Sequence, residues 1–222
     1  MGTQAISMKP TAVHPVRLLV SSVPTERNRL TTAFRPILAI PHLLLVGGPI
    51  AAMFTWTTND GDVSRSWGAG GVLGAVAFLC AVIAWFAIVF TARAPEGLWR
   101  LSAFYLRWRV RSSAYVALLR DEYPPFGEAA YPVEVDIPVP LEPRDRLTVA
   151  FRPIFALPHL LLIWLLGVAW GVTSIIAWIA ILFTGRYPQR LYDFSVGALR
   201  WTTRVEAYLL LLTDEYPPFT LD

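Results

Sequence analysis

The sequence predicts an all-α integral membrane protein made of two tandem parallel repeats. Each repeat is expected to be a transmembrane helical hairpin followed by an amphipathic interfacial helix, with short cytoplasmic strands. Three observations lead to this prediction: the composition, long uncharged runs and an internal duplication. Of the 222 residues, 55% are hydrophobic and only 16% are charged, whereas roughly a quarter of the residues of a soluble protein are charged. The single cysteine, Cys80, lies in an apolar run, which excludes a disulfide framework and a thiolate metal site.

Three uncharged apolar runs cover residues 36–59, 66–92 and 153–185. The first two are each long enough for one helix across a hydrocarbon layer of about 30 Å. A short polar turn at residues 60–65 joins them, so they are expected to form a hairpin. A single helix over the third run would be close to 50 Å long, which is more than a modest tilt absorbs.

A tandem duplication explains the third run. The segment Pro41-His-Leu-Leu-Leu recurs at Pro158, an offset of 117 residues, and Asp-Glu-Tyr-Pro-Pro-Phe at 121–126 recurs at 214–219, an offset of 93 residues. Copy one therefore covers residues 14–126 and copy two residues 131–219, and copy one holds 24 extra residues near its polar turn.

Because copy one contains two predicted spans, at about 36–57 and 68–92, copy two should contain two as well. These are expected at about 148–167 and 169–186, with a tight turn at the glycines of residues 167–171. Arginines flank every span. Four spans place all of these arginines on one side, as the positive-inside rule requires, with both termini cytoplasmic.

Amphipathic stretches follow each hairpin, at about 96–121 and 189–213. Each carries an apolar stripe with tryptophan beside an arginine stripe, which suits the headgroup layer of an anionic phospholipid membrane. An alternative fits the same pattern, in which the apolar stripe packs on the protein's own helices and the arginines only set the topology. The candidate headgroup ligands are Arg100, Arg107, Arg111, Arg200 and Arg204. Guanidinium groups match phosphate oxygens, and no nucleic-acid-binding motif is present.

Arg35 and His42, repeated as Arg152 and His159, form the candidate intramembrane polar site. Seven residues are about two helical turns, so each pair shares a face, with the histidine about 10 Å deeper. Ionisable groups at this depth are functional candidates. The interpretation favoured here is structural: Pro41 and Pro158 free a backbone carbonyl, which a neutral histidine satisfies.

The repeated Asp-Glu-Tyr-Pro-Pro-Phe motif is the other polar candidate. It offers carboxylates, aromatic rings and a stiff turn to a partner protein. The favoured interpretation is that the prolines end the interfacial helix and the carboxylates pair with arginines. The partner-binding candidates are Asp121, Glu122, Tyr123, Phe126, Asp214, Glu215, Tyr216 and Phe219.

The linker at 127–143 alternates apolar and polar residues from Val133 to Val139. This pattern is typical of a short strand, and the corresponding segment at 16–23 is expected to pair with it in a small cytoplasmic sheet.

The motifs together resemble a bacterial membrane family called domain of unknown function 4389. The resemblance is carried by Phe-Arg-Pro-Ile-Phe-Ala-Leu-Pro-His-Leu from Phe151, Ile-Leu-Phe-Thr-Gly-Arg-Tyr-Pro from Ile181 and Asp-Glu-Tyr-Pro-Pro-Phe from Asp214. Copy one departs from it where Thr-Ala-Arg-Ala-Pro follows from Thr91. The resemblance implies a small integral membrane protein of bacteria, here a multi-pass protein of the cytoplasmic (inner) membrane, and it implies no activity.

Catalytic chemistry is not expected, because the three histidines have no metal-ligand spacing and Cys80 has no base near it in sequence. No catalytic residue, metal or cofactor is predicted. The leading hypothesis is a non-catalytic accessory or scaffold subunit of a membrane complex, in contact with anionic lipid and with a membrane protein partner. The alternative is a lipid or small-molecule transporter with a site between the repeats.

Overall fold

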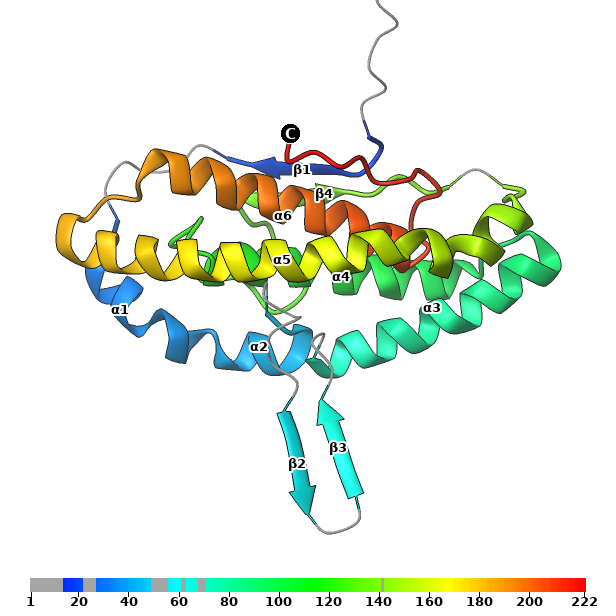
Figure 1. Ribbon diagram of the computed structural model, residues 1–222, viewed down its shortest axis with the longest axis horizontal. Helices are drawn as coiled ribbons and strands as arrows, with labels where there is room; N and C mark the ends of the chain where they lie inside the picture. Colours follow the sequence, from blue (N-terminus) through cyan, green and yellow to red (C-terminus); the bar gives the residue numbers. More distant parts are fainter. Residues whose placement is uncertain (1–13, 22–26, 49–55, 61–62, 68–70, 141) are drawn as a thin grey trace, which may run out of the picture.

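The computed structural model describes residues 14–21, 27–48, 56–60, 63–67, 71–140 and 142–222. The described residues form six helices and four strands in three layers (Figure 1). The apolar layer consists of α1 (Arg29–Leu38), α2 (Ile40–Val46), α3 (Gly71–Thr91) and α5 (Arg146–Thr184). The inner helix layer consists of α4 (Glu96–Val116) and α6 (Gln189–Leu209), and the sheet layer consists of β1 (Arg17–Val20) and β4 (Val133–Asp136).

The strand prediction is confirmed. β1 and β4 pair antiparallel, with Leu18 opposite Val135. Leu18 and Val135 occupy the same position in the two copies, so each copy contacts the other through the same residue position. Such self-complementary pairing is the signature of a twofold relation.

Contacts between the two copies are reciprocal elsewhere too. The backbone N–H of Arg27 donates to the Gly185 carbonyl at 2.9 Å, and that of the equivalent Arg144 donates to the Ala92 carbonyl at 2.9 Å. Likewise, the indole of Trp178 donates to the Thr32 carbonyl, and the indole of Trp85 donates to the Val149 carbonyl, both at 2.9 Å. The apolar helices of each copy are thus tied to those of the other.

Copy two contains one long helix where two spans were predicted. α5 runs without a break from Arg146 to Thr184, so the predicted turn at residues 167–171 is wrong. Buried residues occur from Val149 to Ile181, at intervals of three or four positions as far as His159 and unevenly beyond it. Gly167, Trp170 and Gly171 are among them, so the region of the predicted turn packs as helix on the rest of the protein.

Copy one follows the same path with an interruption. α1 and α2 are bent by 42° at Ala39, where Pro41 begins the next turn. The chain leaves the helix at Gly47, whose φ of 73° favours glycine, so the first predicted span does not continue as a helix to residue 57. Residues 49–55 and 61–62 lie outside the described residues. The predicted polar turn falls in a hairpin of β2 (Trp56–Asp60) and β3 (Val63–Trp67), which projects from the apolar layer (Figure 1). α3 agrees with the second predicted span.

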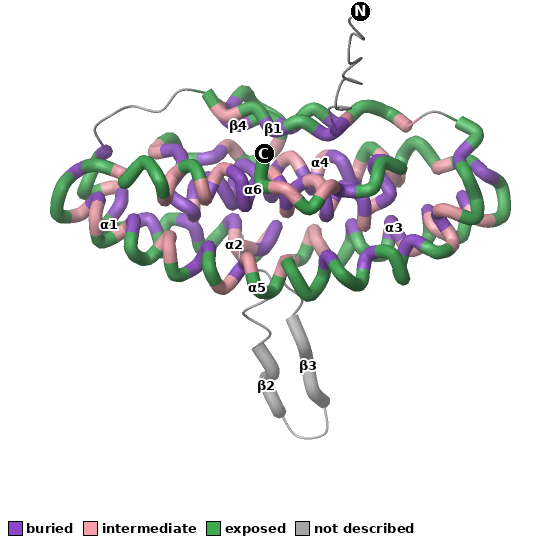
Figure 2. Tube along the Cα trace, turned by 45° about the horizontal axis from the view of Figure 1, so that its top comes forward, coloured by how far each residue is buried: buried purple, intermediate pink, exposed green. Residues whose placement is uncertain are grey.

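α1, α2, α3 and α5 contain many exposed residues (Figure 2), and large apolar side chains are among them. Among the most exposed large side chains are Phe183 at 79%, Phe90 at 71%, Leu147 at 70% and Leu30 at 69%. α3 and α5 are each long and apolar enough to cross a membrane, and the bent α1–α2 pair would be a third if it counts as one span.

α4 is the central helix of the molecule rather than a peripheral one. Twelve of its 21 residues are buried, from Ser102 to Tyr115. Leu106, Val110 and Ala114 share a cluster with β1, β4 and α6 residues. For α4, the alternative that its apolar stripe packs on the protein itself is the one observed.

Candidate functional site

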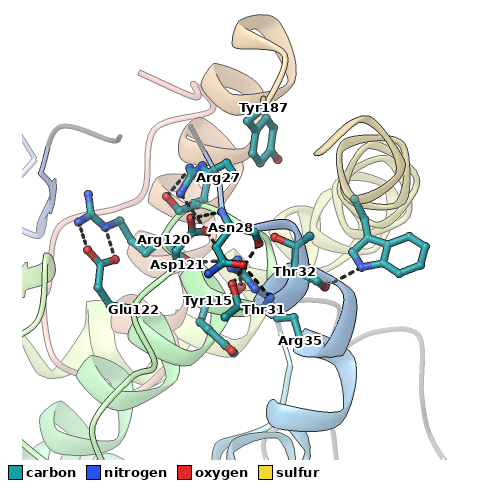
Figure 3. Close-up of polar contacts among 12 residues, drawn as sticks. Arg27, Asn28, Thr31, Thr32, Arg35, Tyr115, Arg120, Asp121, Glu122 and Tyr187 are labelled. Atoms are coloured by element: carbon teal, nitrogen blue, oxygen red, sulfur yellow. Dashed lines mark hydrogen bonds and ion pairs between the residues drawn. The ribbon is translucent and has the colours of Figure 1, made fainter. Parts of the chain in front are cut away.

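The first polar cluster joins the start of α1 to the segment after α4 (Figure 3). Arg35 is 2% exposed, and its guanidinium donates to the Asp121 carboxylate at 2.8 Å. It also donates to the carbonyls of Tyr115, at 3.2 Å, and Arg120, at 2.9 Å. These carbonyls lie at and beyond the end of α4, where helix carbonyls lack helical partners and a positive charge is favourable.

Copy two repeats this cluster residue for residue. Arg152 donates to the Asp214 carboxylate at 2.6 Å and to the carbonyls of Tyr208 and Thr213, both at 3.0 Å. Each arginine also lies over a tyrosine ring, Arg35 over Tyr115 at 4.6 Å and Arg152 over Tyr208 at 4.3 Å. We call each of these clusters an arginine clasp.

A second arginine completes each clasp. Arg27 donates to Asp121 at 3.2 Å and to the Leu119 carbonyl at 3.0 Å. The equivalent Arg144 makes a bidentate ion pair with Asp214. Burial alone would raise the pKa of the Asp214 carboxyl, but hydrogen bonds and charge from Arg144 and Arg152 hold the pKa below its usual range. The sequence analysis missed Arg27 and Arg144, although the offset of 117 residues relates them.

Glu122 and Glu215 do not take part in the clasps. Glu122 accepts hydrogen bonds from the Arg120 guanidinium at 2.7 and 3.1 Å. Burial would raise its pKa, but the contact with Arg120 lowers it below the usual range. Glu215 is exposed.

Each predicted histidine lies in a cage of aromatic rings. His42 stacks on Phe126 with ring centroids 4.5 Å apart, and Tyr123 and Trp108 complete the cage. His159 stacks on Phe219 at 4.3 Å, with Tyr216 and Trp201 beside it. The rings of the Asp-Glu-Tyr-Pro-Pro-Phe motif therefore cover the histidine of their own copy.

The histidines do not serve the predicted role of satisfying carbonyls freed by proline. His42 Nδ1 accepts a hydrogen bond from the Trp108 indole at 3.0 Å. Neither ring nitrogen of His159 has a hydrogen-bond partner among the described residues. The indole of Trp201, which is equivalent to Trp108, donates to the Pro218 carbonyl instead. Stacking, rather than carbonyl repair, is what the two histidines share.

Arginines of α4 and α6 donate hydrogen bonds to the segments that follow the two Tyr-Pro-Pro-Phe motifs. Arg111 is buried and donates to the carbonyls of Gly127 and Ala129, at 3.0 and 2.9 Å, so it does not face a lipid surface as predicted. The equivalent Arg204 donates to the Asp222 carbonyl at 2.7 Å, and Arg200 to the Leu221 carbonyl at 3.4 Å.

The two remaining headgroup candidates pair with glutamates. Arg107 lies 3.8 Å from Glu128, and the exposed Arg100 lies 2.6 Å from Glu96, one helical turn away. All five candidates are on the inner helix layer, not on the apolar layer.

Each Arg–His pair makes its contacts within its own copy, and among the described residues no hydrogen bond or ring contact joins the pair of one copy to that of the other. Among the described residues, no group of histidine, cysteine, aspartate and glutamate side chains could hold a metal ion.

Comparison with known proteins gives one match. No curated protein and no solved structure matches the chain. The family described as "Domain of unknown function (DUF4389)" matches residues 66–127 and 146–220. Both matched segments end just after the Tyr-Pro-Pro-Phe rings that cover the histidines, and together they span more than half of the sequence. The chain therefore belongs to the DUF4389 family and contains two copies of its domain.

Proposed function

We propose that this protein is a non-catalytic scaffold subunit of a bacterial cytoplasmic-membrane complex, anchored by its apolar layer. The observation that carries the proposal is that polar and apolar side chains of the apolar layer face different surroundings. The polar candidates in the apolar layer are bound inside their own copies by the clasps and cages, while the outward side chains of that layer are exposed and apolar. Exposed apolar surface on this scale marks a membrane or protein contact.

The helix lengths favour a layer that lies along the membrane. α5 has 39 residues and is about 58 Å long, against a hydrocarbon thickness of about 30 Å. The antiparallel α6 packs along α5 and carries Arg200 and Arg204 about 16 and 22 Å from its first residue. If α5 crossed the bilayer, it would carry these arginines into hydrocarbon, which is costly.

In this arrangement the twofold relation between the copies lies along the membrane normal, so the repeats are parallel. Arg29 and Arg93 at the outer ends of copy one, and Arg146 and Arg186 at the ends of α5, then reach the same headgroup layer. Both termini and the β1–β4 sheet lie on the cytoplasmic side. This model keeps the predicted orientation and replaces the four predicted spans.

The transporter alternative requires a shared polar site between the copies. The separate clasps and cages favour the scaffold, because they leave the two Arg–His pairs occupied within their own copies. Anionic phospholipid and a membrane protein partner are the proposed contacts.

Cysteine labelling tests the orientation. With Cys80 replaced by alanine, single cysteines are placed at Ala169, in the middle of α5, and at Glu134, on β4. An impermeant thiol reagent added from outside should reach neither site in intact cells. Labelling at Ala169 would restore the four-span model, in which this residue lies in an external turn, and labelling at Glu134 would reverse the orientation.

Purification in mild detergent tests the scaffold role. We expect a membrane protein to co-purify in fixed stoichiometry. Solute or lipid transport by the purified chain in vesicles, lost on replacing Arg35 and Arg152 with glutamine in variants that stay folded, would favour the transporter instead.

A further inference from the structure

A pocket of about 330 Å³ opens at the junction where copy one begins and α5 ends. Arg27, Arg29, Thr184, Gly185 and Arg186 line it. Three arginines thus line one cavity, and no carboxylate is among its lining residues in the part of the chain that the structure describes. Guanidinium groups bind phosphate oxygens with two-point geometry, so the chemistry of the pocket is that of a phosphate site.

Two of these arginines are available to a ligand. Arg27 is committed to Asp121 and Leu119, whereas Arg29 and Arg186 are exposed and make no side-chain hydrogen bond within the described residues. Arg29 lies close over Gly185, because a Cβ added there would sit 3.3 Å from its Nε. The glycine therefore leaves room for the guanidinium beside the backbone.

Two strongly exposed apolar residues are next in sequence to lining residues of the pocket. Phe183, at 79%, precedes Thr184 on α5, and Leu30, at 69%, follows Arg29 on α1. A ligand with a phosphate beside apolar chains would satisfy both surfaces. We propose that the pocket formed by Arg27, Arg29 and Arg186 binds the phosphate of an anionic phospholipid, whose acyl chains lie against Leu30 and Phe183. The site rests on the proposed membrane embedding of the apolar layer.

The equivalent junction at the other end differs in two respects. Ala92 replaces Gly185, so a Cβ stands where the first junction has none. In addition, the Glu142 carboxylate accepts a hydrogen bond from the Ala94 N–H at 2.9 Å. A carboxylate of the chain thus lies at that junction, and its arginines Arg93 and Arg146 provide a control pair with the same charge.

The test measures lipid binding by the full chain. Arg29→Gln/Arg186→Gln is compared with Arg93→Gln/Arg146→Gln, and both are purified in a neutral detergent. Retention of phosphatidylglycerol is titrated by native mass spectrometry, with phosphatidylcholine and inorganic phosphate as competitors. Each basic group near an anionic headgroup contributes enough that losing two should weaken phosphatidylglycerol binding about 30-fold. The control pair also removes two positive charges near the headgroup layer, so it should weaken phosphatidylglycerol binding too, but clearly less than Arg29→Gln/Arg186→Gln does.

Equal weakening by both variants, or by neither, would overturn the site. Displacement of the lipid by inorganic phosphate alone at similar concentration would overturn the lipid assignment, because the acyl contacts would then contribute nothing. Flotation with phosphatidylcholine vesicles provides a separate readout of embedding. Failure to float would overturn the proposed membrane embedding of the apolar layer. Flotation without a preference for phosphatidylglycerol would overturn only the lipid site in the pocket.

Discussion

Copy one and copy two begin their apolar helices with equivalent clasps and cages, yet only copy one leaves the helix in the middle. In copy one, α2 ends at Val46, and the Arg109 guanidinium donates to the Val46 carbonyl at 2.8 Å. The equivalent residue of copy two is Thr202, whose hydroxyl donates to Ala198 within its own helix. The carbonyls at a helix end lack helical partners and need such a donor. We infer that Arg109 is present in copy one because the helix ends there.

The segment inserted in copy one begins and ends at neighbouring points of the apolar layer. A Cβ added at Gly71, the first residue of α3, would meet the Leu45 backbone at 2.6 Å. The end of α2 and the start of α3 are therefore in contact, although 24 residues separate Val46 from Gly71 in the sequence. The comparison shows that the long helical path through the apolar layer is common to both copies and that the hairpin is an addition to it.

The clasps should be of equal importance in the two copies, and their loss is the largest effect we expect. Arg35→Leu and Arg152→Leu each remove a buried guanidinium and leave carbonyls and a carboxylate without their donor. Each should lower the free energy of unfolding by about 3–5 kcal/mol, measured by denaturant titration in detergent. A large loss in one copy only would mean that the second clasp is dispensable.

The histidine cages should respond differently. His42→Phe leaves the Trp108 indole without its acceptor and should cost about 1–3 kcal/mol. His159→Phe should cost less than 1 kcal/mol or stabilise the fold, because neither ring nitrogen has a hydrogen-bond partner among the residues that the structure describes. Thermal unfolding of the two variants compares them directly. Equal costs would show that both histidines act through stacking alone.

A smaller difference is expected at the end of the apolar helices. Ala92 has a φ of 59° and its equivalent Gly185 a φ of 72°. Since a side chain in the left-handed region is strained, Ala92→Gly should stabilise the fold by about 0.5–1 kcal/mol. The reverse change, Gly185→Ala, should destabilise it by about 1 kcal/mol. Matching shifts of opposite sign in the unfolding midpoint would support this, and a loss from Ala92→Gly would contradict it.

Deleting residues 47–70 should change stability least, although it changes the sequence most. It joins Val46 directly to Gly71, as Ile163 is joined to Trp164 in α5. We expect a folded chain whose free energy of unfolding changes by about 1 kcal/mol or less, because a loop closure is removed. Circular dichroism should show a higher helical fraction. If the deleted chain fails to fold, the hairpin is required for folding of copy one, although copy two has no hairpin.

Much of this architecture follows from the sequence. The duplication predicts that the Arg–His pair and the Asp-Glu-Tyr-Pro-Pro-Phe motif recur, and the motif predicts that its carboxylates pair with arginines. The stacking of the motif's rings on the histidines was not predicted. The alternation from Val133 predicts β4 and its pairing with β1. The error at residues 167–171 has a physical cause. An apolar run of this length fits two crossings or one helix lying in the plane, and hydropathy is the same for both.

The site residues were harder to assign for a related reason. Arginines at helix ends satisfy the positive-inside rule whether they face lipid or bind carbonyls, so Arg111 and Arg204 look alike in sequence to free headgroup ligands. Only the position of the segments after each Tyr-Pro-Pro-Phe motif distinguishes these roles. The pocket at Gly185 depends on bringing together residues more than 150 positions apart, which no local pattern signals.

The pairing of Leu18 with Val135 has a consequence for chain connectivity. The hydroxyl of Tyr131, the first residue of copy two, donates to the Glu122 carbonyl of copy one at 3.0 Å, and four residues connect Phe126 to Tyr131. The equivalent His14 lies beside Glu215, so Phe219 and His14 stand in the same relation without a covalent link between them. A circular permutant that begins at Tyr131 and carries a peptide of about four residues between Phe219 and His14 is therefore compatible with the same fold. The fold then does not require that copy one precede copy two in the chain.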